Sequence, residues 1–295
     1  MSADIVISKM TSSPLAAKHK EWSEALSGHD PNSIQNQIDA LLSDFAAYLV
    51  INYARGLAPK DADGEPKVSP LLHRLLDRTF AESTMVRIRK LTEARQCQPK
   101  KAVHSLVALL QDMHDHPHLL TRENILRCRH ETIDRLAGTS PASRLPRDAI
   151  PPDWFKARIT RITKRSRNVK NFVNKFLAHA ATPASRESVN SDEMKVHLAR
   201  LWQATALICK VAHQVDVEIL GGCACEPLGP YPPCEFKYLL VEPANPDDIQ
   251  DLQRFWERVQ QKVERWFGVR KLSGSGPFFD WFWSHHSQTV GDCGN

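Results

Sequence analysis

The stretch that decides the fold is Trp154-Phe-Lys-Ala-Arg-Ile-Thr-Arg-Ile-Thr-Lys-Arg-Ser-Arg-Asn-Val-Lys-Asn-Phe-Val-Asn-Lys-Phe-Leu-Ala-His-Ala180. One set of its positions recurs at alternating steps of four and three residues, which places these positions on a single helix face. Such spacing is typical of a helix that packs in a bundle. We therefore predict a long helix here whose inward face consists of Phe155, Ile159, Ile162, Ser166, Val169, Val173 and Phe176.

The sequence on both sides of this helix shows the same helical period. A helix is expected after Pro31, with Asn32 or Ser33 as its N-cap and with Gly56 and Pro59 ending it. Strand signals are nearly absent before about residue 220, so the predicted fold class is all-α, an antiparallel helical bundle. Further helices are predicted from Pro70 to Leu91, from about Lys101 to Met113, from Thr121 through Leu136, from Ser191 to Leu220, where Gly221 and Gly222 stop it, and over Asp247–Phe267.

Three regions are expected along the chain. Residues 1–30 have little periodicity and are predicted to be a loosely ordered lead-in with a short helix around residues 15–26. Residues 31–222 form the bundle. Residues 223–295 are expected to be a small extension, with a proline-rich linker, one short strand at Glu235–Glu242, one helix and an aromatic tail. The tail should pack on the bundle or form an interface with a second subunit, because it contains Phe278, Phe279, Trp281, Phe282 and Trp283.

The composition indicates an ordinary globular protein. The chain has 295 residues, a quarter of them charged, and shows neither a secretory leader nor an apolar run long enough to cross a bilayer. Its seven cysteines are an odd number and are scattered, which favours reduced thiols over a disulfide framework. These features predict a soluble, cytoplasmic protein without a membrane partner, and no cofactor is expected.

Positive charge is concentrated in the predicted basic helix. It contains eight basic residues and no acidic one, whereas the net charge of the chain is +5, so the remainder sums to 5 − 8 = −3. Eight unbalanced like charges repel one another, which favours a partner that neutralises them: RNA, DNA or an acidic protein. A plain solvated helix face is the alternative. The candidate RNA-binding residues are Lys156, Arg158, Arg161, Lys164, Arg165, Arg167 and Lys170, with Lys175 near the histidine that follows.

The end of this helix, Asn174-Lys-Phe-Leu-Ala-His179, resembles the Asn-Lys-x-x-Ala-His element of HEPN proteins, specifically their abortive-infection AbiU-type branch. Met85-Val-Arg-Ile-Arg-Lys-Leu-Thr-Glu93 is similar to the second helix of that branch. His104-Ser-Leu-Val-Ala-Leu-Leu110 and Leu119-Leu-Thr-Arg-Glu-Asn124 resemble its third helix and the connection that follows. The resemblance covers roughly residues 33–222. It implies a helical bundle, usually a homodimer, in a bacterial defence or toxin–antitoxin setting, where an acidic antitoxin could be the partner.

Many HEPN proteins are metal-independent endoribonucleases that use an Arg-x4–6-His pair. The resemblance implies His179 as general acid–base, Asn174 as an orienting group and Lys175 as the cation beside the phosphate. The position of the family's arginine is occupied by Val173, which has no donor and lies on the inward face. Two hypotheses therefore stay open: an RNA-cleaving enzyme, and a catalytically silent module that binds RNA or protein. A structural scaffold without nucleic acid is a third, and a hydrogen-bonded packing role for His179 is the plain alternative to catalysis.

Metal binding is not expected, although two clusters have suitable side chains. Cys223, Cys225 and Cys234 lack the paired Cys-x2-Cys spacing of well-formed zinc sites. His114-Asp-His-Pro-His118 contains Pro117, which prevents one helix face from presenting all its imidazoles, so an exposed turn is predicted.

Overall fold

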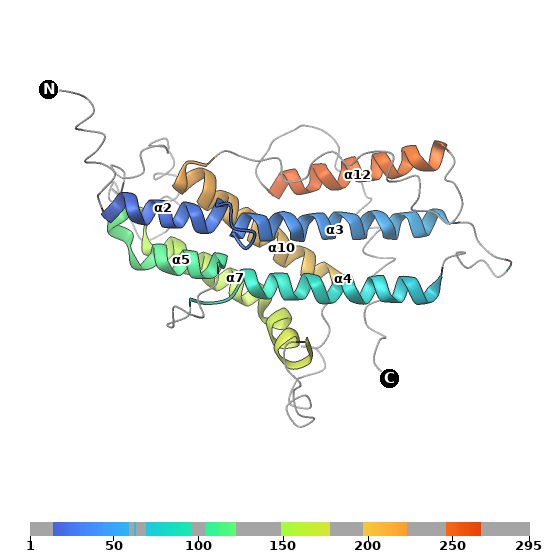
Figure 1. Cartoon of the computed structure of the whole chain (residues 1–295), viewed down its shortest axis with the longest axis horizontal. Coiled ribbons are helices and arrows are strands. Elements are labelled where there is room, and N and C mark those ends of the chain that lie inside the picture. Colours follow the sequence, from blue (N-terminus) through green and yellow to red (C-terminus); the bar gives the residue numbers. More distant parts are fainter. Residues whose placement is uncertain are drawn as a thin grey trace. The chain divides into compact units, whose positions relative to one another are not determined.

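The computed structural model describes residues 14–58, 62, 69–95, 104–121, 149–177, 197–222 and 246–266. The described residues are helical almost throughout and contain no strand, which confirms the all-α class (Figure 1). Their one β-type pairing is an isolated bridge between Thr121 and Ala149. The predicted strand at Glu235–Glu242, the predicted helix through Leu136 and the aromatic tail lie outside the described residues.

Most of the predicted helix ends that fall within the described residues are confirmed to within a few positions, whereas the predicted start at Ser191 lies outside them. Within the described part of the chain, none is both long and apolar enough to cross a bilayer. The elements are α2 (Pro14–Ser27), α3 (Ile34–Leu57), α4 (Pro70–Leu91), α5 (Leu106–Asp115), the 3-10 turn η2 (Pro117–Leu119), α7 (Pro152–Phe172) continued by the π-helix η3 (Val173–Leu177), α10 (Leu198–His213) continued by the π-helix η4 (Gln214–Leu220), and α12 (Pro246–Trp266).

Local signals explain several of these ends. The Ser33 hydroxyl accepts a hydrogen bond from the Asn36 backbone N–H at 3.4 Å, as expected for the N-cap of α3. α5 begins at Leu106, later than predicted, because the Ser105 hydroxyl caps it by accepting from the Ala108 N–H at 3.0 Å. Gly221 has φ of 70° and ends η4, which confirms the glycine stop.

The chain forms two compact units, and α3, α4, α7 and α10 each contribute residues to both. Unit 1 consists of residues 1–38, 89–167 and 207–225. In this unit α2 packs against α5 and η4. The short helix predicted around residues 15–26 is confirmed as α2, and Trp22 and Leu26 are completely buried in this unit. Trp22 holds this helix in place, because its ring is buried and its Nε1 donates a hydrogen bond to Asp112 of α5.

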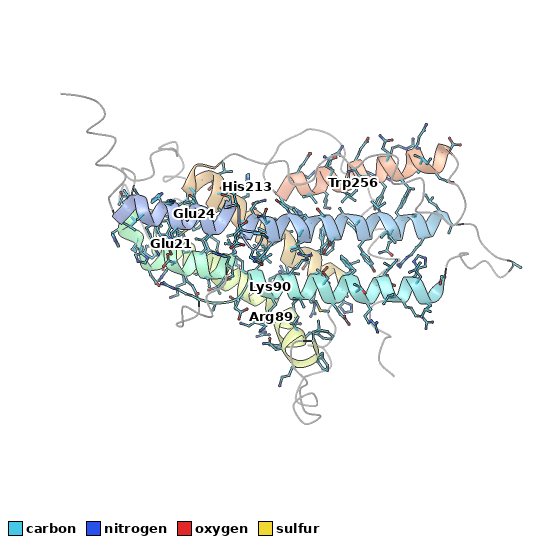
Figure 2. All side chains as sticks on the ribbon, in the orientation of Figure 1. Glu21, Glu24, Arg89, Lys90, His213 and Trp256 are labelled. Carbon is cyan, nitrogen blue, oxygen red and sulfur yellow. The ribbon has the colours of Figure 1, made fainter. Side chains whose placement is uncertain are left out.

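Unit 2 consists of residues 39–88, 168–206 and 226–295, and its described core is rich in aromatic contacts. Tyr48 stacks on Phe80 with ring centroids 3.8 Å apart, and Phe45 meets both Phe80 and Trp202 edge-on. Burial raises the pKa of Tyr48 to about 12. One face of α12 is apolar and packs inward: Leu252, Phe255, Val259 and Val263 are buried and Ile249 is partly buried. Figure 2 marks the neighbouring Trp256, which is also buried.

Candidate nucleic-acid interface

The helix α7 has a buried face and a cationic face. Five of the seven predicted inward positions are completely buried, and the Ser166 hydroxyl satisfies its hydrogen bond by donating to the Ile162 carbonyl at 2.8 Å. Ile159 and Phe176 are partly exposed. The cationic face lies on the other side of the helix, where five side chains are exposed in unit 1: Lys156, Arg161, Lys164, Arg165 and Arg167.

Arg158 differs from these five cations. Its guanidinium carbon lies 3.6 Å from the centroid of the Trp154 ring, and Nη1 donates to the Trp154 carbonyl at 3.3 Å. Burial, together with the neighbouring charge of Arg161, lowers the pKa of Arg158 to about 10. Arg158 therefore serves packing in this structure, while the exposed cations around it face solvent.

Four of the exposed cations have no acidic partner in the part of the chain that the structure describes. Within the described residues, no carboxylate lies within ion-pair distance of Lys156, Arg161, Lys164 or Arg167. A solvated helix face in a globular protein usually alternates its charges, with acids four residues from bases. This face does not, so its positive potential is open to an external anion.

Of the motif, residues 174–177 lie in the π-helix η3, which belongs to unit 2. Val173 is completely buried, as its place on the inward face predicts. Asn174 and Lys175 are partly buried, and the Asn174 Oδ1 is buried without a hydrogen-bond partner among the described residues. Lys170, also in unit 2, is partly buried. His179 lies outside the described residues, so its grouping with Asn174 and Lys175 stays a prediction.

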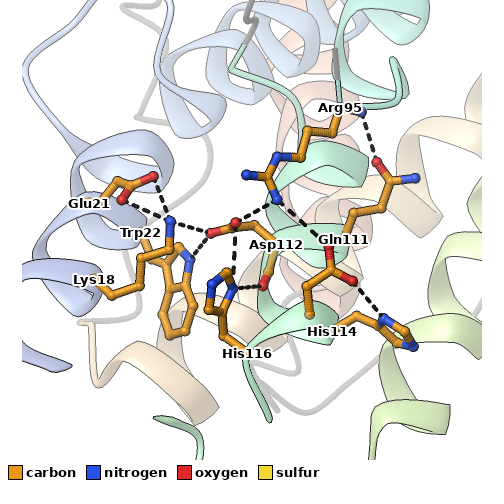
Figure 3. Close-up of polar contacts among 9 residues, drawn as sticks. Lys18, Glu21, Trp22, Arg95, Gln111, Asp112, His114 and His116 are labelled. Atoms are coloured by element: carbon orange, nitrogen blue, oxygen red, sulfur yellow. Dashed lines mark hydrogen bonds and ion pairs between the residues drawn. The ribbon is translucent and has the colours of Figure 1, made fainter. Parts of the chain in front are cut away.

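A polar cluster that the sequence does not reveal lies in unit 1, around Asp112 of α5 (Figure 3). The Trp22 Nε1 donates to its Oδ2 at 2.6 Å, and the Lys18 Nζ lies 2.8 Å from the same oxygen. Arg95 Nη1 lies 2.9 Å from Oδ1, and the His116 Nδ1 lies 2.7 Å from the Asp112 backbone carbonyl. Asp112 thus joins α2, α5 and the segment that precedes α5.

The pKa of Asp112 reflects two opposing effects. Burial by itself would raise this pKa, because only 11% of the side chain is exposed. Hydrogen bonds from Lys18 and Trp22 and the charges of Lys18 and Arg95 outweigh burial, and the pKa lies below its ordinary value. The charged form of Lys18 is stabilised as well. Burial by itself would lower the pKa of Lys18, but Asp112 and Glu21 raise it above its ordinary value. The Asp112 carboxylate is therefore charged and held in place at neutral pH.

Two cavities flank Arg95, both within unit 1. One of about 690 Å³ is lined by Arg95, by Gln111, His114 and Asp115 of α5, and by Lys156, Ile159 and Thr160 of α7. The other, of about 620 Å³, is lined mainly by α2 and α5 and by more acidic than basic side chains, among them Glu21, Glu24, Asp30 and Asp112. The first cavity lies beside the cationic face of α7, and its lining includes one of the predicted RNA-binding residues, Lys156.

No metal centre is evident in the described residues, since no three His, Cys, Asp or Glu side chains there could hold a metal ion together. The histidine-rich segment is not an open turn throughout, because α5 continues to Asp115 and η2 follows at Pro117. Cys209 is buried as a reduced thiol. The cysteines considered for zinc, at positions 223, 225 and 234, lie outside the described residues.

The chain matches no protein-family model, no curated protein and no solved structure.

Proposed function

We propose that the protein binds RNA through the exposed cationic face of α7 in unit 1. The observation that supports this most is the set of exposed cations without a carboxylate partner in the described residues: Lys156, Arg161, Lys164 and Arg167. From the first to the last they extend about 16 Å along one helix, at about 1.5 Å per residue, which is long enough to contact several phosphates of one strand. Arg165 is exposed on the same face and adds to the potential.

A polyanion fits this face better than a folded protein partner does. Protein interfaces have a desolvated centre of aromatic and other apolar side chains. The exposed positions of α7 between Lys156 and Arg167 are cations, threonines and one alanine, and none is a large apolar residue. Lysine and arginine that neutralise phosphates release condensed counterions, so affinity should fall steeply with salt.

The resemblance to HEPN proteins extends this proposal to metal-independent cleavage at His179, in a bacterial defence or toxin–antitoxin setting. The alternative is a catalytically silent helical module that binds RNA or protein. The burial of Val173 supports the silent module, because HEPN enzymes have an arginine at this position and valine has neither its charge nor its hydrogen-bond donors. A cleaving enzyme would need Lys175 or another cation to stabilise the phosphate charge.

The binding test compares two charge reversals of equal size. Arg161→Glu with Lys164→Glu changes the net charge from +5 to +1, and Arg74→Glu with Arg78→Glu on the exposed side of α4 changes it identically. Fluorescence anisotropy with a labelled single-stranded RNA should show at least a tenfold weaker affinity for the α7 variant and little change for the α4 control. Equal loss in both variants would mean that only net charge matters, and an unchanged α7 variant would refute the proposal.

Cleavage is tested separately. Wild-type protein and His179→Ala are incubated with the same RNA in EDTA. Cleavage by the wild type alone supports the enzyme, whereas equal binding without cleavage by both supports the silent module. An affinity for an acidic protein that exceeds the affinity for RNA would assign the face to a protein partner instead.

A further inference from the structure

We propose that the 690 Å³ cavity between α5 and α7 binds one phosphate group of the RNA, with Arg95 as its bidentate ligand and Lys156 as the second cation. This inference rests on the proposed function, and it names a contact that lies outside the basic helix. Lys156 lines the cavity and also begins a stripe on α7, since Thr160, Thr163 and Arg167 follow it at steps of four, three and four residues. A strand that follows this stripe would therefore reach the cavity at its end.

Arg95 is held in a defined position. Its backbone N–H donates to the Gln111 Oε1 at 2.8 Å, so the chain before α5 is fixed to that helix. Its Nη1 lies 2.9 Å from Asp112 Oδ1 and 3.6 Å from Asp115 Oδ2. Because Asp112 is itself fixed by Lys18 and Trp22, the guanidinium is positioned before any ligand arrives.

The anchoring contacts leave a donor edge of Arg95 available. Both ion pairs use Nη1, and neither Nε nor Nη2 has a partner among the described residues. In Figure 3 the other terminal nitrogen of Arg95 has no marked contact with Asp112 or Asp115. Adjacent N–H groups of a guanidinium match two oxygens of a phosphate, a geometry that a lysine cannot reproduce. About half of the Arg95 side chain, 53%, is exposed to solvent.

The charges around the cavity favour an anion. Arg95 and Lys156 are positive, Asp115 is negative, and the Thr160 hydroxyl can donate a hydrogen bond. The buried Asp112 charge is offset by Lys18 at 2.8 Å. Asp115 is the one lining group that opposes a phosphate, and its 57% exposure lets solvent screen that repulsion. The His114 Nδ1 lies 3.2 Å from the Asp115 Oδ1. Asp115 therefore keeps a partner if its ion pair with Arg95 is replaced by a phosphate contact.

The test measures RNA affinity as a function of salt for three variants and a control. Arg95→Lys keeps the charge beside Asp112 but loses the bidentate edge, and it should bind about five- to tenfold more weakly. Lys156→Gln should weaken binding similarly and reduce the salt slope by about 0.7, the value for one phosphate contact on a single strand. Arg74→Lys on α4 is the matched control and should bind as the wild type does. Thermal unfolding of each variant identifies any loss of folding.

Asp115→Asn provides a result of opposite sign. Removal of the competing carboxylate should strengthen RNA binding by about two- to fivefold, an effect that a merely structural role for Arg95 would not produce. Wild-type affinities for Arg95→Lys, Lys156→Gln and Asp115→Asn would overturn the phosphate site. The proposed function would stay intact if Arg161→Glu with Lys164→Glu still weakens binding at least tenfold. Absence of RNA binding by the wild type would overturn both.

Discussion

Replacing Asp112 by asparagine should destabilise unit 1 by about 2–4 kcal/mol. The carboxylate accepts hydrogen bonds from Trp22 and Lys18, and bonds to a charged group contribute about 1.5–3 kcal/mol each. An asparagine oxygen can still accept from Trp22, so about one charge-assisted bond is lost. Lys18, only 19% exposed, then keeps Glu21 alone as a partner, which adds part of the penalty for an uncompensated buried charge. Arg95 adds little, because its side chain is half exposed.

The assay is urea unfolding followed by far-UV circular dichroism, with amide hydrogen exchange of α2 and α5 to locate the effect. With an m-value of about 2 kcal/mol/M, the midpoint should fall by about 1–2 M. Glu24→Gln is the matched control, since Glu24 lies on α2 in the same unit (Figure 2) and pairs with Lys20 only at the surface. We expect the control to change stability by less than about 0.5 kcal/mol. A midpoint shift for Asp112→Asn no larger than that of Glu24→Gln would refute the structural role assigned to this carboxylate.

Three further predictions concern stability. The pKa of Asp112 is lower in the folded than in the unfolded chain, so its contribution to stability is complete above the unfolded value of about 3.9 and is lost as the pH falls through the folded value. The urea midpoint of Asp112→Asn should therefore fall less over this pH range than the midpoint of the wild type. Parallel pH profiles of the two proteins would contradict this. Val173→Arg should cost more than about 3 kcal/mol in thermal unfolding, because the site is completely buried, and a wild-type melting temperature would show that the site admits the guanidinium. Gly221→Ala should cost about 1 kcal/mol, since φ is 70°, and unchanged unfolding would show that the cap relaxes without strain.

The helices are predictable from the sequence because their signals are local. The alternation of four and three residues in α7 is enough by itself to identify most of its buried positions, including Val173. Ser33 and Gly221 likewise act on residues within one turn of themselves. The predicted start of α5 is wrong because Ser105 caps the helix, although a serine before an apolar run is a known signal.

Of the two cations proposed to bind a phosphate, the sequence predicts Lys156 but not Arg95. The cations of α7 form a run without acids, but Arg95 lies in a short segment that has no helical period. The one available sign of the buried cluster is that Asp112 follows Leu109 by three residues and precedes His116 by four, on the face of α5 that packs inward.

The sequence by itself determined which segments are helical, which face of each is apolar, and where unbalanced positive charge gathers. Only the tertiary structure decided that Asp112 would be charged and fixed, because its partner Trp22 is 90 residues away along the chain. Helical period and capping depend on neighbours within a few residues. The compensation of a buried charge depends on which distant segments pack around it, and that is why the position of Arg95 beside Lys156 is set only in the folded chain.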